Sequence, residues 1–136
     1  MASIMNVKDI DKTALTTMYW ERSKSMLTDA DLSIESGRWN SAANRFYYSI
    51  LYALNALFEK DGNSIKSFRS AKRVLGKKYV LMGKIDAKYG RFFSQLEAMR
   101  LKVDFDVSFL ATEEEINDYR PKVDDFIATI KKLIDE

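Results

Sequence analysis

The sequence contains no cysteine and no histidine, and its 136 residues include only five glycines and one proline. Without cysteine there are no disulfides, thiol nucleophiles, zinc–thiolate sites or iron–sulfur clusters held by thiolates. Without histidine, the side chain that ordinarily exchanges protons near neutral pH is also missing. The low glycine and proline content and the 46% hydrophobic residues exclude collagen-like, low-complexity and most disordered chains. We therefore expect one compact domain with its own core and no bound metal or cofactor.

Long apolar runs are also missing. The longest charge-free run beyond the N-terminus covers residues 46–58, thirteen residues, whereas a membrane span needs about 20. The N-terminus has no cationic stretch followed by an apolar block, so no secretory signal is predicted. We expect a cytoplasmic protein.

Helical patterns separated by glycine and capping residues extend along the chain, and no convincing strand pattern interrupts them. We predict an all-α, five-helix up-and-down bundle over residues 13–136, preceded by a flexible N-terminal arm at residues 1–12. Residues 104–111 form the expected connector before the last helix, which Thr112 and Glu115 should cap reciprocally. The predicted helices cover about residues 13–36, 41–60, 67–80 and 86–102, and a fifth begins after Thr112.

Two of these helices carry special features. The second helix, with Asn40 or Ser41 as its expected cap, is apolar around most of its circumference, so it should lie at the centre of the bundle. Pro121 lies inside the fifth helix, where it removes a backbone donor and crowds the preceding turn. We therefore expect that helix to kink near residues 117–120.

One face of the second helix combines Arg45, Tyr48 and Tyr52 at helical spacing, flanked by Asn44 and Asn55. Polar groups in so apolar a helix need partners, because burying them unpaired is costly. The arginine is either a structural residue clamped by a carboxylate or a group that contacts a phosphate or base. The carboxylates expected for the structural alternative are Glu97, Asp104 and Asp106.

Charge is unevenly distributed. Residues 60–91 contain ten basic residues and two acidic ones, a local net charge of +8, while the rest of the chain carries −6. Within this segment a cationic stripe is predicted along the third helix. The stripe can follow a phosphate backbone, remain a solvated face, or dock an acidic partner or the chain's own last helix. Its members are Lys66, Arg69, Arg73 and Lys77.

The stretch from Ser36 to Phe58, SGRWNSAANRFYYSILYALNALF, resembles the second helix of HEPN domains (higher eukaryotes and prokaryotes nucleotide-binding). The similarity continues through residues 76–80, 83–85 and 99–106, and it covers about residues 13–134. The combination of N-R-x-Y-Y with the later R-x-x-x-D-F-D carries the resemblance. It is closest to the small stand-alone prokaryotic members of the family.

The resemblance implies a five-helix bundle that usually dimerises. Catalytic HEPN members are metal-independent ribonucleases that use an arginine followed a few residues later by a histidine. Many other members are accessory subunits of minimal nucleotidyltransferases, often in toxin–antitoxin pairs. Here Arg100 aligns with the catalytic arginine, but Phe105 stands where the histidine is required. Tyr52 and Phe68 occupy two further positions that are often histidine in relatives.

These departures argue against catalysis, because phenylalanine cannot titrate and tyrosine is a poor base at pH 7. We expect a non-catalytic binding or accessory subunit, a homodimer that contacts RNA or a nucleotide, a minimal nucleotidyltransferase, or both. Two alternatives remain: a weak metal-independent ribonuclease using Arg100 with Asp104 or Asp106, and a purely structural interaction module. The predicted ligand-binding residues are Arg45, Tyr48, Tyr52 and Arg100, with Asp104 as ionic partner.

Overall fold

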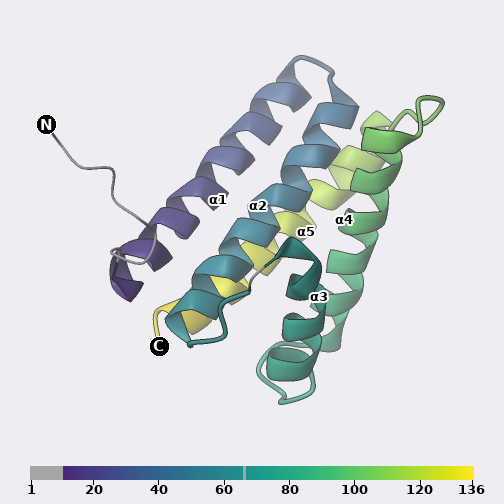
Figure 1. The fold of residues 1–136 in the computed structure, drawn as a ribbon. Coiled ribbons are helices and arrows are strands. Elements are labelled where there is room, and N and C mark those ends of the chain that lie inside the picture. Colours follow the sequence, from purple (N-terminus) through teal and green to yellow (C-terminus); the bar gives the residue numbers. More distant parts are fainter. Residues whose placement is uncertain (1–10, 66) are drawn as a thin grey trace, which may run out of the picture.

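Four long helices lie side by side along one direction, and a short helical segment packs near one end of them (Figure 1). The computed structural model describes residues 11–65 and 67–136, and within these ranges it contains helices and no strand. The predicted all-α class and the five-helix bundle are thereby confirmed. The long helices are α1 (Lys12–Glu35), α2 (Trp39–Lys60), α4 (Ala87–Phe105) and α5 (Glu113–Ile134).

The turn between α1 and α2 lies at one end of the bundle (Figure 1). Asp11 caps α1 by accepting a hydrogen bond from the Ala14 amide at 2.8 Å, so the helix includes Lys12 from the predicted arm. The rest of that arm, residues 1–10, lies outside the described residues. Gly37 supplies the left-handed turn, with φ +69°, that follows α1. The hydroxyl of Ser23 then donates to the Ser49 carbonyl at 2.6 Å, which ties the two helices together.

The predicted cap of α2 is wrong. The helix starts at Trp39 after Arg38, so Asn40 and Ser41 already lie in its first turn. The Asn40 side chain is engaged elsewhere: its oxygen accepts from the Ala111 amide at 2.8 Å, and its nitrogen donates to the Phe109 carbonyl at 3.4 Å. The asparagine therefore holds the connector between α4 and α5 against α2, a long-range contact that local spacing cannot reveal.

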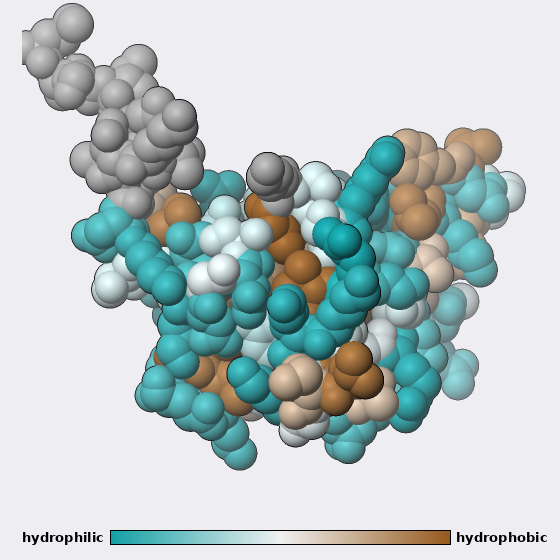
Figure 2. All heavy atoms as spheres, turned by 60° about the horizontal axis from the view of Figure 1, so that its bottom comes forward, coloured by the Kyte–Doolittle hydropathy of each residue, from teal (hydrophilic) through white to brown (hydrophobic). Residues whose placement is uncertain are grey.

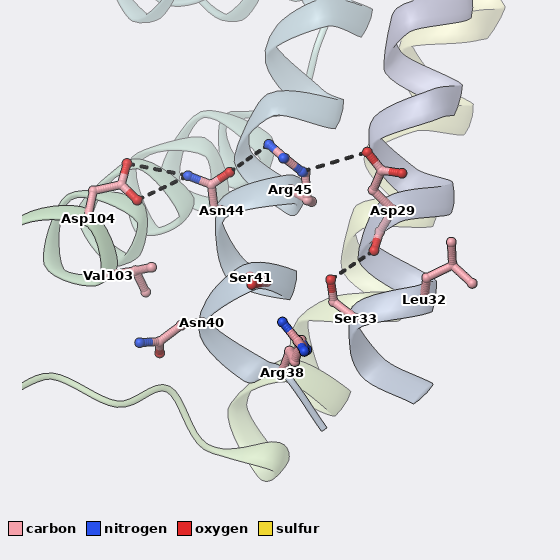
Figure 3. Close-up of a pocket in the computed structure, with 10 residues that line it drawn as sticks. All are labelled: Asp29, Leu32, Ser33, Arg38, Asn40, Ser41, Asn44, Arg45, Val103 and Asp104. Atoms are coloured by element: carbon pink, nitrogen blue, oxygen red, sulfur yellow. Dashed lines mark hydrogen bonds and ion pairs between the residues drawn. The ribbon is translucent and has the colours of Figure 1, made fainter. Parts of the chain in front are cut away.

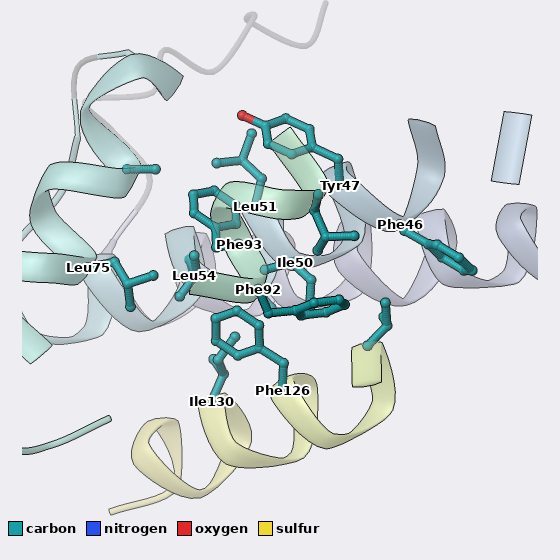
Figure 4. Packing of buried hydrophobic residues seen from close by; sticks show 14 of the residues in the cluster. Phe46, Tyr47, Ile50, Leu51, Leu54, Leu75, Phe92, Phe93, Phe126 and Ile130 are labelled. Atoms are coloured by element: carbon teal, nitrogen blue, oxygen red, sulfur yellow. The ribbon is translucent and has the colours of Figure 1, made fainter. Parts of the chain in front are cut away.

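The central position of α2 is confirmed. Its buried side chains contact α1 on one side and α4 and α5 on the others. Figure 4 shows buried side chains from three helices packed together here, with Ile50 and Leu54 from α2, Phe93 from α4 and Phe126 from α5. Each of these four side chains is fully buried. This shared core fixes how the helix faces are turned.

The predicted third helix, residues 67–80, is only partly correct. A 3₁₀ turn η2 (Phe68–Ser70) leads into one α-helical turn α3 (Ala71–Val74), and a π-helical segment η3 (Leu75–Val80) follows. The wider turn is seen in the hydrogen bond from the Leu81 amide to the Gly76 carbonyl, five residues back, at 2.8 Å. Contacts outside the segment hold its end, because the buried Tyr79 hydroxyl donates to Asp61 at 2.8 Å.

α4 continues to Phe105, three residues beyond the predicted end at about 102. Its last turn is held by Asp104, which bonds to Asn44 of α2, so the connector is shorter than predicted. The reciprocal cap between Thr112 and Glu115 at the start of α5 is confirmed. Pro121 lies inside α5, which continues past it, and the kink there stays a prediction. None of the helices described is long and apolar enough to span a bilayer.

Candidate functional site

Arg45 is paired with a carboxylate that the sequence did not indicate. Its Nε lies 3.7 Å from Asp29 Oδ2 on α1, and its Nη1 donates to Asn44 Oδ1 at 3.1 Å (Figure 3). The three carboxylates expected from the sequence are therefore the wrong partners. Both side chains of the pair are nearly half exposed, 42% for Arg45 and 46% for Asp29, so water screens the interaction. The ion pair with Asp29 therefore holds the Arg45 side chain only weakly.

Asn44 continues this chain of contacts to α4. Its amide nitrogen lies 3.1 and 3.3 Å from the two carboxylate oxygens of Asp104, and Arg100 Nη1 donates to Asp104 at 3.4 Å. The predicted site residues Arg45 and Arg100 are thus connected through Asn44 and Asp104. We call these four residues the arginine network. Asp104 was expected to be an ionic partner in the site, and it forms its ion pair with Arg100, four residues earlier on the same helix.

Arg100 has little contact with solvent. Its guanidinium lies over the rings of Tyr47 and Tyr48, 4.8 and 5.8 Å from their centroids, and its side chain is 19% exposed. Its Nε is buried without a hydrogen-bond partner. Burial acts to lower the pKa of Arg100, but Tyr48, Tyr47 and Asp104 outweigh this and raise it above the ordinary value. The guanidinium therefore stays charged, and Tyr47, Tyr48 and Asp104 of the same chain balance most of that charge.

The tyrosines of α2 form a ladder that extends to α1. Tyr48 lies 6.5 Å from Tyr52, which stacks on Tyr19 at the same centroid distance, and Arg22 covers the Tyr52 ring at 5.8 Å. Tyr19 and Arg22 were missed in the sequence analysis. The available signal was Arg22 itself, a charge that interrupts the apolar spacing of the first helix. Burial, followed by the negative charge of Glu97, raises the pKa of Tyr47, so its phenol is no base near neutral pH.

A groove of about 440 Å³ opens beside the arginine network, between the end of the α1–α2 hairpin and α4 (Figure 3). Arg38 lines it, and among the described residues its side chain has no ion pair or hydrogen bond. The groove also contains Asp29 and Asp104 beside Arg45, so acidic and basic side chains balance. It is a polar recess without a net charge of either sign.

The two carboxylates predicted to work with Arg100, Asp104 and Asp106, are both engaged. Asp106 accepts hydrogen bonds from the Ser108 hydroxyl at 2.6 Å and from its amide at 3.0 Å. These bonds lower the pKa of Asp106, which makes it a weaker base. Asp104 is held by Asn44 and Arg100, as described above. Over residues 11–65 and 67–136, no group of three or more acidic side chains is placed to hold a metal ion.

A second surface differs in its charge balance. The basic side chains of residues 67–91 make no ion pair within the described part of the chain, whereas seven of the twelve other described lysines and arginines do. Figure 2, which looks towards the end of the bundle carrying α3, shows hydrophilic side chains over much of this face. We call it the basic surface. Its members are Arg69, Lys72, Arg73, Lys77, Lys78, Lys84, Lys88 and Arg91.

The predicted stripe is part of this surface. Arg69, Arg73 and Lys77 are exposed, while Lys66 lies outside the described residues. The stripe was drawn for a regular α-helix, and the wider turn from Leu75 onward changes the spacing at Lys77. The predicted stripe missed Lys72, Lys78 and Lys84, and it also missed Lys88 and Arg91 on α4, a helix that contacts α3. Their local excess of positive charge was the available signal.

Comparison with known proteins gives consistent matches over nearly the whole chain. The family model described as "HEPN domain" matches residues 16–133. A "UPF0332 protein" of Thermotoga maritima is 29% identical over 119 residues, which cover 87% of this chain and 90% of that protein. A protein of Methanocaldococcus jannaschii named "Putative toxin MJ0605" is 27% identical over 116 residues, 85% of this chain and 86% of that one.

Proposed function

The chain belongs to the HEPN domain family, and from that premise we propose that it is a non-catalytic member that binds RNA through its basic surface. The observation that carries the proposal is the segregation of unpaired cations. Lys72, Arg73 and Arg91 are exposed and lack acidic partners within the described residues, so their charge remains available to an anion. Neutralising phosphates with such side chains releases counterions, which supplies most of the affinity of sequence-independent binding.

The arginine network is less suited to be the main anion contact. Arg100 is tucked against Tyr47 and Tyr48 and paired with Asp104, and Arg45 has Asp29 beside it. An incoming phosphate must compete with these carboxylates, whereas at the basic surface it competes only with water and salt. We therefore propose that the arginine network positions α1, α2 and α4 and adds a secondary contact at most.

The proposal is non-catalytic because the residues predicted to work with Arg100 are not equipped to move a proton. Phe105, at the position of the expected histidine, is 78% exposed and cannot titrate. Asp106 is stabilised as a carboxylate by Ser108, and Asp104 is held by two partners. A general acid or base works best with a pKa near the working pH. These contacts weigh against the alternative of a weak ribonuclease.

Reversing one charge on the basic surface tests the proposal. We expect Arg73→Glu to weaken binding of a fluorescent single-stranded RNA by about three- to tenfold in low salt, and to flatten the salt dependence of binding. Fluorescence anisotropy across a salt series measures both quantities. The same RNA, incubated with the wild-type protein and a chelator and run on a gel, should stay intact.

Arg38→Glu is the matched control. Arg38 is also an exposed arginine without an ion pair, and it lies at the α1–α2 turn, at the other end of the bundle from α3 (Figure 1). The net charge changes equally in both variants, so Arg38→Glu should bind RNA like the wild type. Equal losses in the two variants, or no binding by the wild-type protein at low salt, would contradict the proposal. RNA cleavage in the chelator would contradict its non-catalytic part.

We further propose that the protein is a homodimer, as the family resemblance implies. Tyrosine and arginine are enriched in protein interfaces, and the ladder of Tyr19, Tyr48 and Tyr52 with Arg22 is only half-buried within one chain. Light scattering coupled to size-exclusion chromatography should give twice the 15.7 kDa of the chain. A mass of one chain at micromolar concentration contradicts this prediction.

A minimal nucleotidyltransferase partner stays a prediction of the resemblance.

A further inference from the structure

We infer that the groove between η3 and α4 holds an unpaired nucleobase of the bound RNA, an inference that rests on the proposed function. The groove has a volume of about 290 Å³. The half-buried Val80 provides an apolar wall, the almost fully buried Leu75 also lines the groove, and Lys72 and Arg91 stand at it as exposed cations. Ligand sites of this kind typically combine an apolar lining with a few polar groups that fix the ligand's orientation.

Each of the two helical elements contributes a glycine to the lining of this groove. Gly76 lies on η3 and Gly90 on α4, and both line the cavity. A Cβ on Gly90 would lie 3.6 Å from the Val80 side chain, which is an ordinary contact, so a methyl group would fit there beside the groove wall. A Cβ on Gly76 would meet no atom within 4 Å. The space in front of Gly76 is therefore empty, and a larger side chain there would enter it.

Neither backbone strain nor packing explains a glycine at position 76. Its φ is not in the left-handed region, since the positive-φ glycines are Gly37, Gly62 and Gly83. Inside a helical segment, glycine is destabilising relative to alanine. The position thus carries a cost without a conformational need, and what it provides is open space. It also lies in a π-helical turn, a feature that is frequent at functional sites.

The positive charges at the groove favour an occupant that joins an apolar part to an anionic part. Arg91 lines this groove and also a neighbouring one beside Lys88 and Lys122, so it stands on the ridge between them. In RNA each nucleobase is attached to a sugar that is flanked by phosphates, and here the phosphates would meet Lys72 and Arg91 as the base enters beside Val80. The volume is at the lower limit of ligand sites, which suits one base. A base in a duplex is not free to enter.

The test fills the groove without changing its charge. Gly76→Leu places an apolar side chain in the open space, and Gly76→Ala is the matched control that adds one methyl group. The probes are a labelled oligouridine and an abasic oligoribonucleotide with the same number of phosphates. The leucine side chain would occupy the space that the base fills and so remove the burial of the base against the apolar lining. We therefore expect Gly76→Leu to weaken oligouridine binding about fivefold or more. Binding of the abasic strand should change less than twofold.

Gly76→Ala should bind both strands like the wild type. Both variants should melt no lower than the wild-type protein by circular dichroism, because each replaces a helical glycine, and a fall in melting temperature counts against the open space described here. Unchanged oligouridine binding by Gly76→Leu overturns the inference, as does an equal loss for both strands. Failure of the proposed function looks different: the wild-type protein then binds neither strand, or Arg73→Glu has no effect on either.

Discussion

Replacing Phe126 with alanine is expected to lower the free energy of unfolding by about 3–5 kcal/mol. Phe126 is fully buried on α5, and its ring lies 5.0 Å from that of Tyr89 and 6.5 Å from that of Phe92 on α4. Truncation removes these contacts and leaves a cavity in the shared core of α2, α4 and α5, which the rigid helices cannot fully close. Domains are typically stable by about 5–15 kcal/mol, so the loss is a large fraction. Urea unfolding followed by far-UV circular dichroism measures it.

Phe105→Ala is the matched control for this prediction. It deletes the same atoms from a ring that is 78% exposed at the end of α4. Its effect on stability should be within about 0.5 kcal/mol, the usual range for surface substitutions. A comparable loss in both variants would show that Phe105 is buried in the protein in solution. The control also removes the side chain that stands at the expected histidine position, so RNA binding can be measured on the same sample.

Alkaline pH is expected to destabilise the protein through Tyr79. Burial, with hydrogen bonding and the negative charge of Asp61, raises the pKa of this phenol far above its ordinary value of 10.0, although the Asn63 bond acts in the opposite direction. As the pH rises past 10, the unfolded chain therefore loses this proton while the folded chain keeps it. The stabilisation is present in full below pH 10 and is lost above it. The loss approaches about 1.4 kcal/mol per pH unit.

Tyr79→Phe isolates this contribution from other groups that titrate in the same range. The variant keeps the ring that stacks on Phe58 at 5.4 Å but loses the proton. Its stability at pH 8 should be lower because the bond to Asp61 is gone, yet its decline between pH 10 and 12 should be shallower than that of the wild type. Urea unfolding at a series of pH values provides the slopes. Parallel slopes for the two proteins would contradict the assignment to Tyr79.

The two candidate surfaces lie at opposite ends of the bundle, and this separation shapes the functional argument. The arginine network joins α2 to α1 and α4 near the α1–α2 turn, whereas the basic surface surrounds α3 (Figure 1). The first surface has its cations matched by acids. The second has the unmatched positive charge that the local net charge of residues 60–91 already indicated. A protein that binds RNA without cleaving it needs the second surface more than the first.

Much of the fold could be read from local patterns. Apolar spacing placed the helices, glycine and capping residues separated them, and Thr112 with Glu115 marked the start of the last. The central position of α2 followed from its apolar circumference. The errors occur where residues far apart in the sequence contact each other. Asn40, predicted as a cap, binds the connector between α4 and α5 instead, and Asp104, beyond the predicted end of α4, lies inside the helix and bonds to Asn44. No pattern within one helix contains these contacts.

The candidate site divides in the same way. The amino-acid sequence alone specifies that no histidine can carry a proton, that Arg45, Tyr48 and Tyr52 share a face, and that positive charge gathers in one segment, because composition and helical periodicity are properties of the chain itself. It does not specify that Asp29 pairs with Arg45, that Arg91 comes beside Lys72, or that Gly76 opens on an empty groove. Those facts depend on how helices remote in sequence are turned and packed against each other, which burial of the shared core decides.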